Sequence, residues 1–161
     1  MLRRSFIISL ILLLTACGFQ LRGSQGSVAL AFKTLSIVGD ASSQVAQNLT
    51  NLMRNQVSMI AAPAPAQVIV ELGKTEHTKA TLTKDAQGRI SEYRLYANIT
   101  MQAYATNKDQ LIKPVTLSVT RTLSTGNGYD TGIDLEESRM YADMDSELAN
   151  LIQYRLRVVK P

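Results

Sequence analysis

Apolar and polar residues alternate most regularly between positions 93 and 104 of the sequence. A period of two residues is typical of a strand that buries one face and leaves the other solvated. The predicted buried face holds Tyr93, Leu95, Ala97, Ile99, Met101 and Ala103. The opposite face holds Arg94, Tyr96, Asn98, Thr100, Gln102 and Tyr104.

A second long strand is predicted after the polar turn at positions 107–109. Pro114 lacks the N–H group that a sheet ladder needs, so this strand begins near Pro114 or forms a sheet edge there. Its inward positions are Val115, Leu117, Val119 and Leu123. Its outward positions are Thr116, Ser118, Thr120 and Thr122.

Two shorter strands are predicted earlier in the chain, at positions 33–38 and 67–73. In the second of them Val68, Val70 and Leu72 fall on one face. The residues that follow, up to Arg89, are mostly polar and contain a turn at positions 84–88. This pattern predicts a long hairpin that leads into the strand at positions 93–104.

The first predicted helix carries its apolar residues at helical spacing. Asp40, Ser42 and Ser43 precede it as possible N-caps. The proline-containing segment 61–66 is expected to end it. The apolar stripe consists of Val45, Leu49, Leu52, Met53 and Val57.

A second helix is predicted near the C-terminus, where Asp134 and Glu137 have the spacing of a capping box. Its apolar stripe is Met140, Met144, Leu148, Leu151 and Ile152. We expect Asp143, Asp145 and Glu147 on its solvated side.

The predicted order is therefore βαβββα, in a single globular domain over residues 32–161. Strands with one apolar face and amphipathic helices bury each other as a two-layer α/β sandwich. We expect a four-stranded, mostly antiparallel mixed sheet with both helices packed on one face. The first two strands, joined through a helix, are expected to be parallel.

The N-terminus has the pattern of an export signal. Arg3 and Arg4 precede an apolar run, and small residues lead to Cys17, the only cysteine. This pattern resembles the lipobox of bacterial lipoproteins, which implies removal of residues 1–16 and acylation of Cys17. The alternative is an ordinary secretory signal followed by a cysteine without that role.

Residues 17–31 are expected to form a lipidated tether, because they include a flexible Gly- and Ser-rich stretch. Gly18 occupies the position at which an aspartate commonly retains lipoproteins at the inner membrane. The resemblance therefore implies an outer-membrane location.

Charge and composition exclude several classes of function. Without Arg3 and Arg4 the chain has 15 basic residues (17 − 2) against 13 acidic ones, which is no signature of binding to nucleic acid or to a membrane surface. One cysteine forms no internal disulfide, and no Cys/His cluster has metal-ligand spacing, so neither a metal nor a cofactor is expected. No apolar run after the signal has the length of a membrane span.

The sequence favours a protein that is not an enzyme. His77, the only histidine, lies in a Lys- and Thr-rich stretch and is expected to be a surface residue. No nucleophile elbow, zinc-protease motif or phosphate-binding glycine loop is present.

Two surfaces are candidates for binding. The outward positions of the two long strands are polar but almost uncharged, which suits contact with a polar wall, although an ordinary solvated face has the same composition. The hairpin is enriched in cations, including Lys84 and Arg89, which suit phosphate groups, although a solvated loop is the simpler interpretation.

Three segments together resemble the LptE family of lipopolysaccharide-assembly lipoproteins. Residues 17–23 are similar to the family's lipidated Cys-Gly, aromatic and Leu-Arg start. Residues 88–95 resemble its glycine turn and Glu-Tyr strand, and residues 119–123 its Val-x-Arg strand end. The element order also agrees with the family fold of two helices on a four-stranded sheet.

The resemblance implies a non-enzymatic protein that plugs the β-barrel LptD, supports its assembly and binds lipopolysaccharide. Lys84 and Arg89 are then candidates for contact with lipopolysaccharide. Tyr96, Thr100, Thr116 and Ser118 are candidates for contact with the barrel. The chain departs from the family in having no Lys or Arg between Ser124 and Glu137, a region in which the family has a basic residue associated with lipopolysaccharide.

Two other classes remain open at this stage. One is a generic periplasmic scaffold for another envelope protein. The other is a periplasmic lipid carrier, which needs an enclosed apolar cavity. An unrecognised hydrolase is a more distant third.

Overall fold

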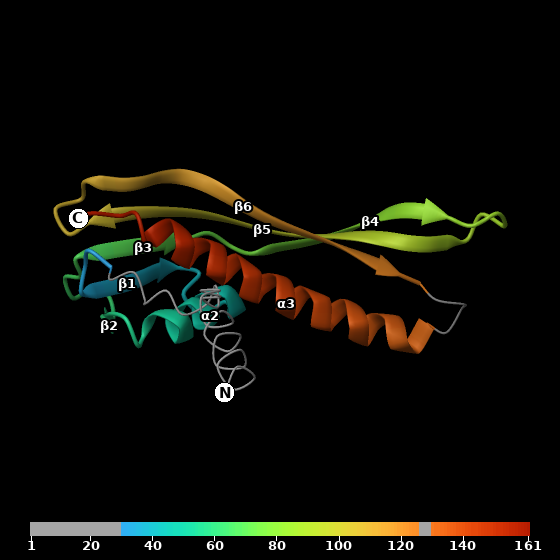
Figure 1. The fold of residues 1–161 in the computed structure, drawn as a ribbon, viewed down its shortest axis with the longest axis horizontal. Coiled ribbons are helices and arrows are strands. Elements are labelled where there is room, and N and C mark those ends of the chain that lie inside the picture. The colour runs from blue at the N-terminus through green and yellow to red at the C-terminus, as the bar shows by residue number, and fades with distance from the viewer. Residues whose placement is uncertain (1–29, 126–129) are drawn as a thin grey trace, which may run out of the picture.

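The longest strand, β5 (Ile90–Ala105), pairs with three other strands of the sheet. The computed structural model describes residues 30–125 and 130–161 (Figure 1). The elements follow the order β1 (Thr34–Gly39), α2 (Gln44–Met53), β2 (Ser58–Met59), β3 (Val68–Leu72), β4 (Glu76–Lys84), β5 (Ile90–Ala105), β6 (Gln110–Ser124) and α3 (Asp130–Leu156). The predicted signal segment, Cys17, the tether up to residue 29 and residues 126–129 lie outside the described residues.

β5 has β6 along one edge and two successive strands along the other. β3 pairs antiparallel with its C-terminal part, and β4 pairs antiparallel with its N-terminal part. Between them the ladder continues through Gly73, whose N–H donates to the Thr100 carbonyl at 2.8 Å. β1 lies parallel to β3, and β2 lies parallel to β1. The predicted mixed sheet, with its parallel first pair, is therefore confirmed.

The predicted number of four strands is wrong, because six strands form the sheet. β2 has only two residues, too few to give an alternating pattern. All nine residues of β4 are exposed, so this strand has no apolar face that a period of two could reveal. The predicted hairpin at this place is nevertheless present, with β4 as its first arm.

β6 is an edge strand, as the second alternative for Pro114 predicted. The register shifts between the pairs Met101–Val115 and Ala103–Ile112. Two residues of β6, Lys113 among them, thus face one residue of β5. Because residues in the bulge are not regularly paired, the missing N–H of Pro114 costs no regular hydrogen bond of the sheet.

Both helices cover the same side of the sheet (Figure 1). Ser43 caps α2, because its Oγ accepts from the N–H of Ala46. The helix ends at Met53 and therefore does not include Val57, which is nonetheless buried. The core between the layers contains the predicted inward residues of β3, β5 and β6 together with Leu49, Leu148 and Ile152.

Two details of the last helix differ from the prediction. α3 begins at Asp130, so Asp134 lies inside the helix and is not its cap. Leu151 is partly exposed, whereas Ala149 and Leu156 are buried. The buried stripe is broader than the predicted one because α3 packs against both α2 and the sheet. No helix among the described residues is both long and apolar enough to cross a membrane.

Candidate interaction surfaces

The polar face of β5 and β6 lies on the side of the sheet away from the helices, because the alternate residues Leu95, Ala97 and Ile99 are buried in the core with residues of both helices. Thr100 and Thr116 face each other across the strands with their Oγ1 atoms 3.0 Å apart. Ser118 donates from Oγ to Asn98 Oδ1 at 2.6 Å. Tyr96 lies two residues before Asn98 in β5 and therefore on the same face. The structure thus brings the four predicted barrel-contact residues Tyr96, Thr100, Thr116 and Ser118 onto one continuous surface.

Charged groups occur at the margins of this polar face. At one margin Gln102 donates from Nε2 to Glu71 Oε2 at 2.7 Å, and at the other Arg94 is exposed opposite Thr122. The hydroxyl and amide groups between these margins already pair partly with each other. Such a surface loses little hydrogen bonding when another polar surface covers it.

The turn of the β4–β5 hairpin carries the two predicted cations. The N–H groups of Gln87 and Arg89 donate to Asp85 Oδ1, and Gly88 has a φ of 78° that suits glycine. Arg89 Nε also donates to Asp85 Oδ2 at 2.7 Å, while most of its side chain is exposed. Hydrogen bonds from Arg89 hold the pKa of the Asp85 carboxyl below its usual value.

Lys84 and Arg89 flank this turn at the end of the hairpin, which lies far from the C-terminus (Figure 1). Lys84 is exposed and makes none of the ion pairs found among the described residues. Arg89 is partly engaged by Asp85, so Lys84 is the freer of the two cations.

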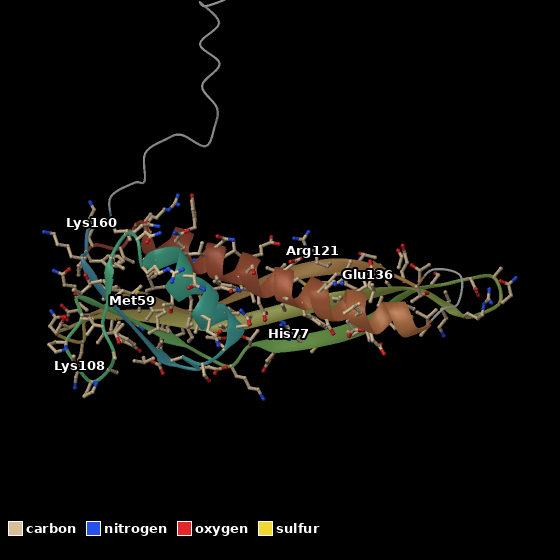
Figure 2. All side chains as sticks on the ribbon, turned by 90° about the horizontal axis from the view of Figure 1, so that it is seen from below. Met59, His77, Lys108, Arg121, Glu136 and Lys160 are labelled. Carbon is tan, nitrogen blue, oxygen red and sulfur yellow. The ribbon has the colours of Figure 1, made fainter. Side chains whose placement is uncertain are left out.

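A group of side chains that sequence reasoning missed joins β4 to α3. His77 Nε2 lies 2.7 Å from Asp145 Oδ1, and the His77 ring stacks on Tyr141 with the ring centres 4.4 Å apart. The Tyr141 hydroxyl donates to the Thr78 carbonyl at 3.0 Å. Figure 2 places His77 beneath α3 on the side of the sheet that the helix covers. Burial raises the pKa of the Tyr141 hydroxyl.

Two further ion pairs join the sheet to α3. Lys79 Nζ lies 2.6 Å from Glu137 Oε2 and 4.8 Å from the centre of the Tyr93 ring. The hydrogen bond to Glu137 raises the pKa of the Lys79 ammonium group. Arg121, labelled in Figure 2, pairs with Glu147 at 2.5 Å. Polar contacts thus hold α3, from Glu137 to Glu147, against strands β4 and β6.

The placement of Asp145 on the solvated side of the last helix was wrong. Asp145 is buried, and its side chain is 8% exposed, whereas the His77 side chain is 34% exposed. Asp145 lies one turn before Ala149, which belongs to the buried stripe. A wider stripe on the helical wheel is the sequence signal that would have placed Asp145 against the sheet. Among the described residues, no group of three or more His, Cys, Asp or Glu could hold a metal ion.

Comparison with known proteins decides the family. The family model LptE, described as lipopolysaccharide-assembly, matches residues 32–156, which is most of the chain and includes every helix and strand from β1 to α3. The chain belongs to the LptE family. Its membership places it among proteins of lipopolysaccharide assembly and confirms the resemblance seen in the sequence. A search of curated proteins finds no significant match.

Solved structures share this LptE fold at low sequence identity. Rare lipoprotein B from Shewanella oneidensis has a TM-score of 0.67 at 16% identity, covering 76% of this chain and 92% of that protein. Lipoprotein B from Nitrosomonas europaea has a TM-score of 0.67 at 21% identity, covering 87% of this chain and 88% of that protein. A minor lipoprotein from Acinetobacter baumannii has a TM-score of 0.65 at 18% identity, covering 80% of this chain and 92% of that protein.

Proposed function

We propose that this LptE-family protein is a lipid-anchored, non-enzymatic component of the outer membrane that occupies the β-barrel LptD. The observation that carries the proposal is the family match over residues 32–156. It spans both helices and the entire sheet, so the proposal concerns the whole folded domain and not one motif.

The uncharged polar face supports the location inside a barrel. The interior of a large membrane barrel is polar, so a plug needs a surface that a polar wall can cover. Thr100, Thr116 and Ser118 present hydroxyl groups on two adjacent strands, and Tyr96 adds an amphipathic ring. We assign Tyr96, Thr100, Thr116 and Ser118 to contact with the barrel wall or rim.

The hairpin turn is the proposed contact for lipopolysaccharide. The lipid A part of that molecule carries phosphates, which Lys meets as a point charge and Arg in bidentate fashion. Lys84 and Arg89 flank a turn at the end of the molecule opposite the C-terminus. The absence of Lys and Arg between Ser124 and Glu137 leaves the hairpin as the basic part of this end.

Anchoring is proposed through acyl groups on Cys17, after removal of residues 1–16. At about 0.8 kcal/mol for each buried methylene group, several acyl chains hold a protein on a membrane effectively without release. Intact-mass analysis of the mature protein tests this step, because an unmodified Cys17 contradicts it. The variant Cys17→Ser should be exported without lipid and should lose function only partly, since the barrel still retains the domain.

Co-purification from detergent-solubilised outer membranes tests the central proposal. A large β-barrel protein in equimolar amount is the expected result. Recovery of a different envelope protein in that ratio favours a generic scaffold. Recovery of bound lipid without protein favours a lipid carrier. Either of these two results contradicts the plug.

A further inference from the structure

One end of the domain, called here the terminal end, gathers segments that are far apart in the sequence. It consists of residues 30–35, 54–69, 104–115 and 151–161. The strand register places Thr34 beside Ser58, Leu35 beside Val68, and Val68 beside Ala105. Figure 2 places the labelled Lys160 and Lys108 at this same end, and Figure 1 places the C-terminus there.

The terminal end is strongly basic, although the chain as a whole is nearly balanced. Its four segments contain seven Lys or Arg residues and a single acidic residue, Asp109. All seven basic residues are exposed. The four ion pairs in the part of the chain that the structure describes all involve other residues. These cations are therefore exposed and have no carboxylate partner among the described residues.

Apolar side chains are exposed at the same end. Tyr154 is 68% exposed and Val158 is 77% exposed, and Leu151 is at the margin of exposure. Tyr154 lies one turn after Leu151 on α3, and Val158 lies two residues beyond the last residue of the helix, Leu156. Arg155 is next to Tyr154 in the sequence, and its side chain is also exposed.

Such a combination of groups matches the chemistry of a lipid surface. Tyr favours the boundary between water and acyl chains, where its ring is buried and its hydroxyl stays hydrated. Arg and Lys beside it can extend their charges to anionic headgroups while their stems cover apolar surface. The three groups occur together only at the terminal end among the residues that the structure describes.

We propose that the terminal end docks on the surface of an anionic phospholipid bilayer through Tyr154, Val158 and the neighbouring cations. The inference uses the proposed lipidation of Cys17 for its geometry. The chain from residue 17 to residue 30 has 13 residue-to-residue steps, which span at most ~45 Å and typically ~20 Å as a coil. Residue 30 precedes β1 at the terminal end, so the lipid anchor brings this end of the domain to the bilayer.

Docking would also set the direction of the domain. The molecule is elongated, and the hairpin turn lies at the end opposite the C-terminus (Figure 1). With the terminal end on the bilayer, Lys84 and Arg89 point away from the phospholipid surface. The lipid-facing and the proposed ligand-facing cations are thus separated by the length of the domain.

A depth measurement on the lipidated, full mature protein tests the proposal. Because Cys17 is the only cysteine and carries lipid, Tyr154→Cys introduces a single free thiol for an environment-sensitive fluorophore. The protein is reconstituted into vesicles of phosphatidylethanolamine and phosphatidylglycerol that contain a lipid-borne quencher. We expect several-fold stronger quenching at position 154 than at Gln87→Cys in the hairpin turn. Equal quenching at both positions overturns the proposal.

Charge variants separate docking from unspecific attraction. Arg155→Glu with Lys160→Glu, added to the labelled protein, should reduce the quenching at position 154 several-fold, as should high salt. Lys74→Glu with Arg139→Glu changes the net charge by the same amount elsewhere and should leave the quenching unchanged. An equal reduction by both pairs, or undiminished quenching in vesicles of phosphatidylcholine alone, contradicts docking on anionic lipid.

Two other outcomes are distinguishable. Energy transfer between labelled copies without lipid quenching identifies the surface as an interface between two copies of this chain and overturns the proposal. A second label on Cys17, detected by mass, contradicts the proposed anchor and not the docking surface. In that case the unlipidated protein is tested by flotation with the same vesicles. Retention of the protein by the anionic vesicles supports docking, and no retention overturns the proposal.

Discussion

The domain has a terminal half, with β1, β2, β3 and α2, and a hairpin half, with β4 and the parts of β5 and β6 beside it. Different interactions hold each half together. In the terminal half, α2 packs its buried Val45, Leu49 and Met53 into the core between α3 and the sheet. In the hairpin half, β4 has no buried residue, and it contacts α3 through His77 and Lys79. The four ion pairs of the described chain all lie in this second half.

This difference predicts different responses to perturbation. Burial of large apolar side chains supplies most of the stability of a domain, whereas an exposed ion pair supplies less than ~1 kcal/mol. The terminal half should therefore be the last part to unfold. The hairpin half should open at lower free energy, which suits a surface that must fit around a ligand and a partner.

The largest effect is expected from a cavity in the terminal half. Leu49→Ala removes a fully buried side chain and should lower the free energy of unfolding by about 2–5 kcal/mol. Leu82→Ala makes the same chemical change on β4, where the side chain is 38% exposed, and should cost less than ~0.5 kcal/mol. Urea unfolding followed by circular dichroism measures both. Similar losses for the two variants would contradict the comparison of the halves.

A smaller and local effect is expected from the contact between β4 and α3. Asp145→Ala removes the buried partner of His77 and should cost about 1–3 kcal/mol. Hydrogen exchange should accelerate at the amides of β4 more than at those of β3, because β3 is held by the apolar core. Asp143→Ala, an exposed position on the same helix, serves as the control for lost charge. Unchanged exchange in β4 would show that the contact does not hold the hairpin.

The third prediction compares the polar face with the terminal end. Photo-crosslinkers at Tyr96 and Ser118 should capture the barrel in cells several-fold more efficiently than one at Gln56, which is exposed beyond the end of α2. Equal capture at all three positions, or none, would favour a polar face that is merely solvated.

Elements with a regular apolar pattern were predictable from the sequence. The two long strands, β3 and both helices came from alternation or helical spacing, because their buried faces carry the pattern. β4 was recognised only as part of a polar hairpin, since its pairing depends on backbone hydrogen bonds to β5. The start of α3 was misplaced because Asp134 and Glu137 imitate a cap within the helix.

Contacts across the sequence were the part that no local pattern predicted. His77 and Asp145 are 68 residues apart, and Arg121 and Glu147 are 26 residues apart. Each of these four residues is of a type that is common on solvated surfaces. Only the registers of β4 and β6 against β5, together with the packing of α3 on the sheet, bring these pairs together. The basic terminal end is likewise assembled from four segments that show no charge run in the sequence.

The smallest effect is expected at the hairpin turn, in the affinity for lipopolysaccharide. Lys84→Glu and Arg89→Glu should each weaken binding roughly two- to fivefold, because an exposed charge contact is worth less than ~1 kcal/mol. Lys84→Glu should have the larger effect, because Asp85 already engages Arg89. Binding is measured on the purified protein at low salt, and co-purification with the barrel is measured in parallel.

Asp85→Asn sharpens this last test. The amide Oδ1 can still accept the N–H bonds of Gln87 and Arg89 that shape the turn, but it no longer carries the charge that holds the Arg89 guanidinium. Affinity should therefore rise slightly in Asp85→Asn and fall again in the double variant with Arg89→Glu. Lost ligand binding with intact barrel association would place the ligand at this end of the domain, apart from the polar face. Unchanged binding in all these variants would show that the turn is an ordinary solvated loop. Of the two ends, only the terminal end would then keep a proposed binding role.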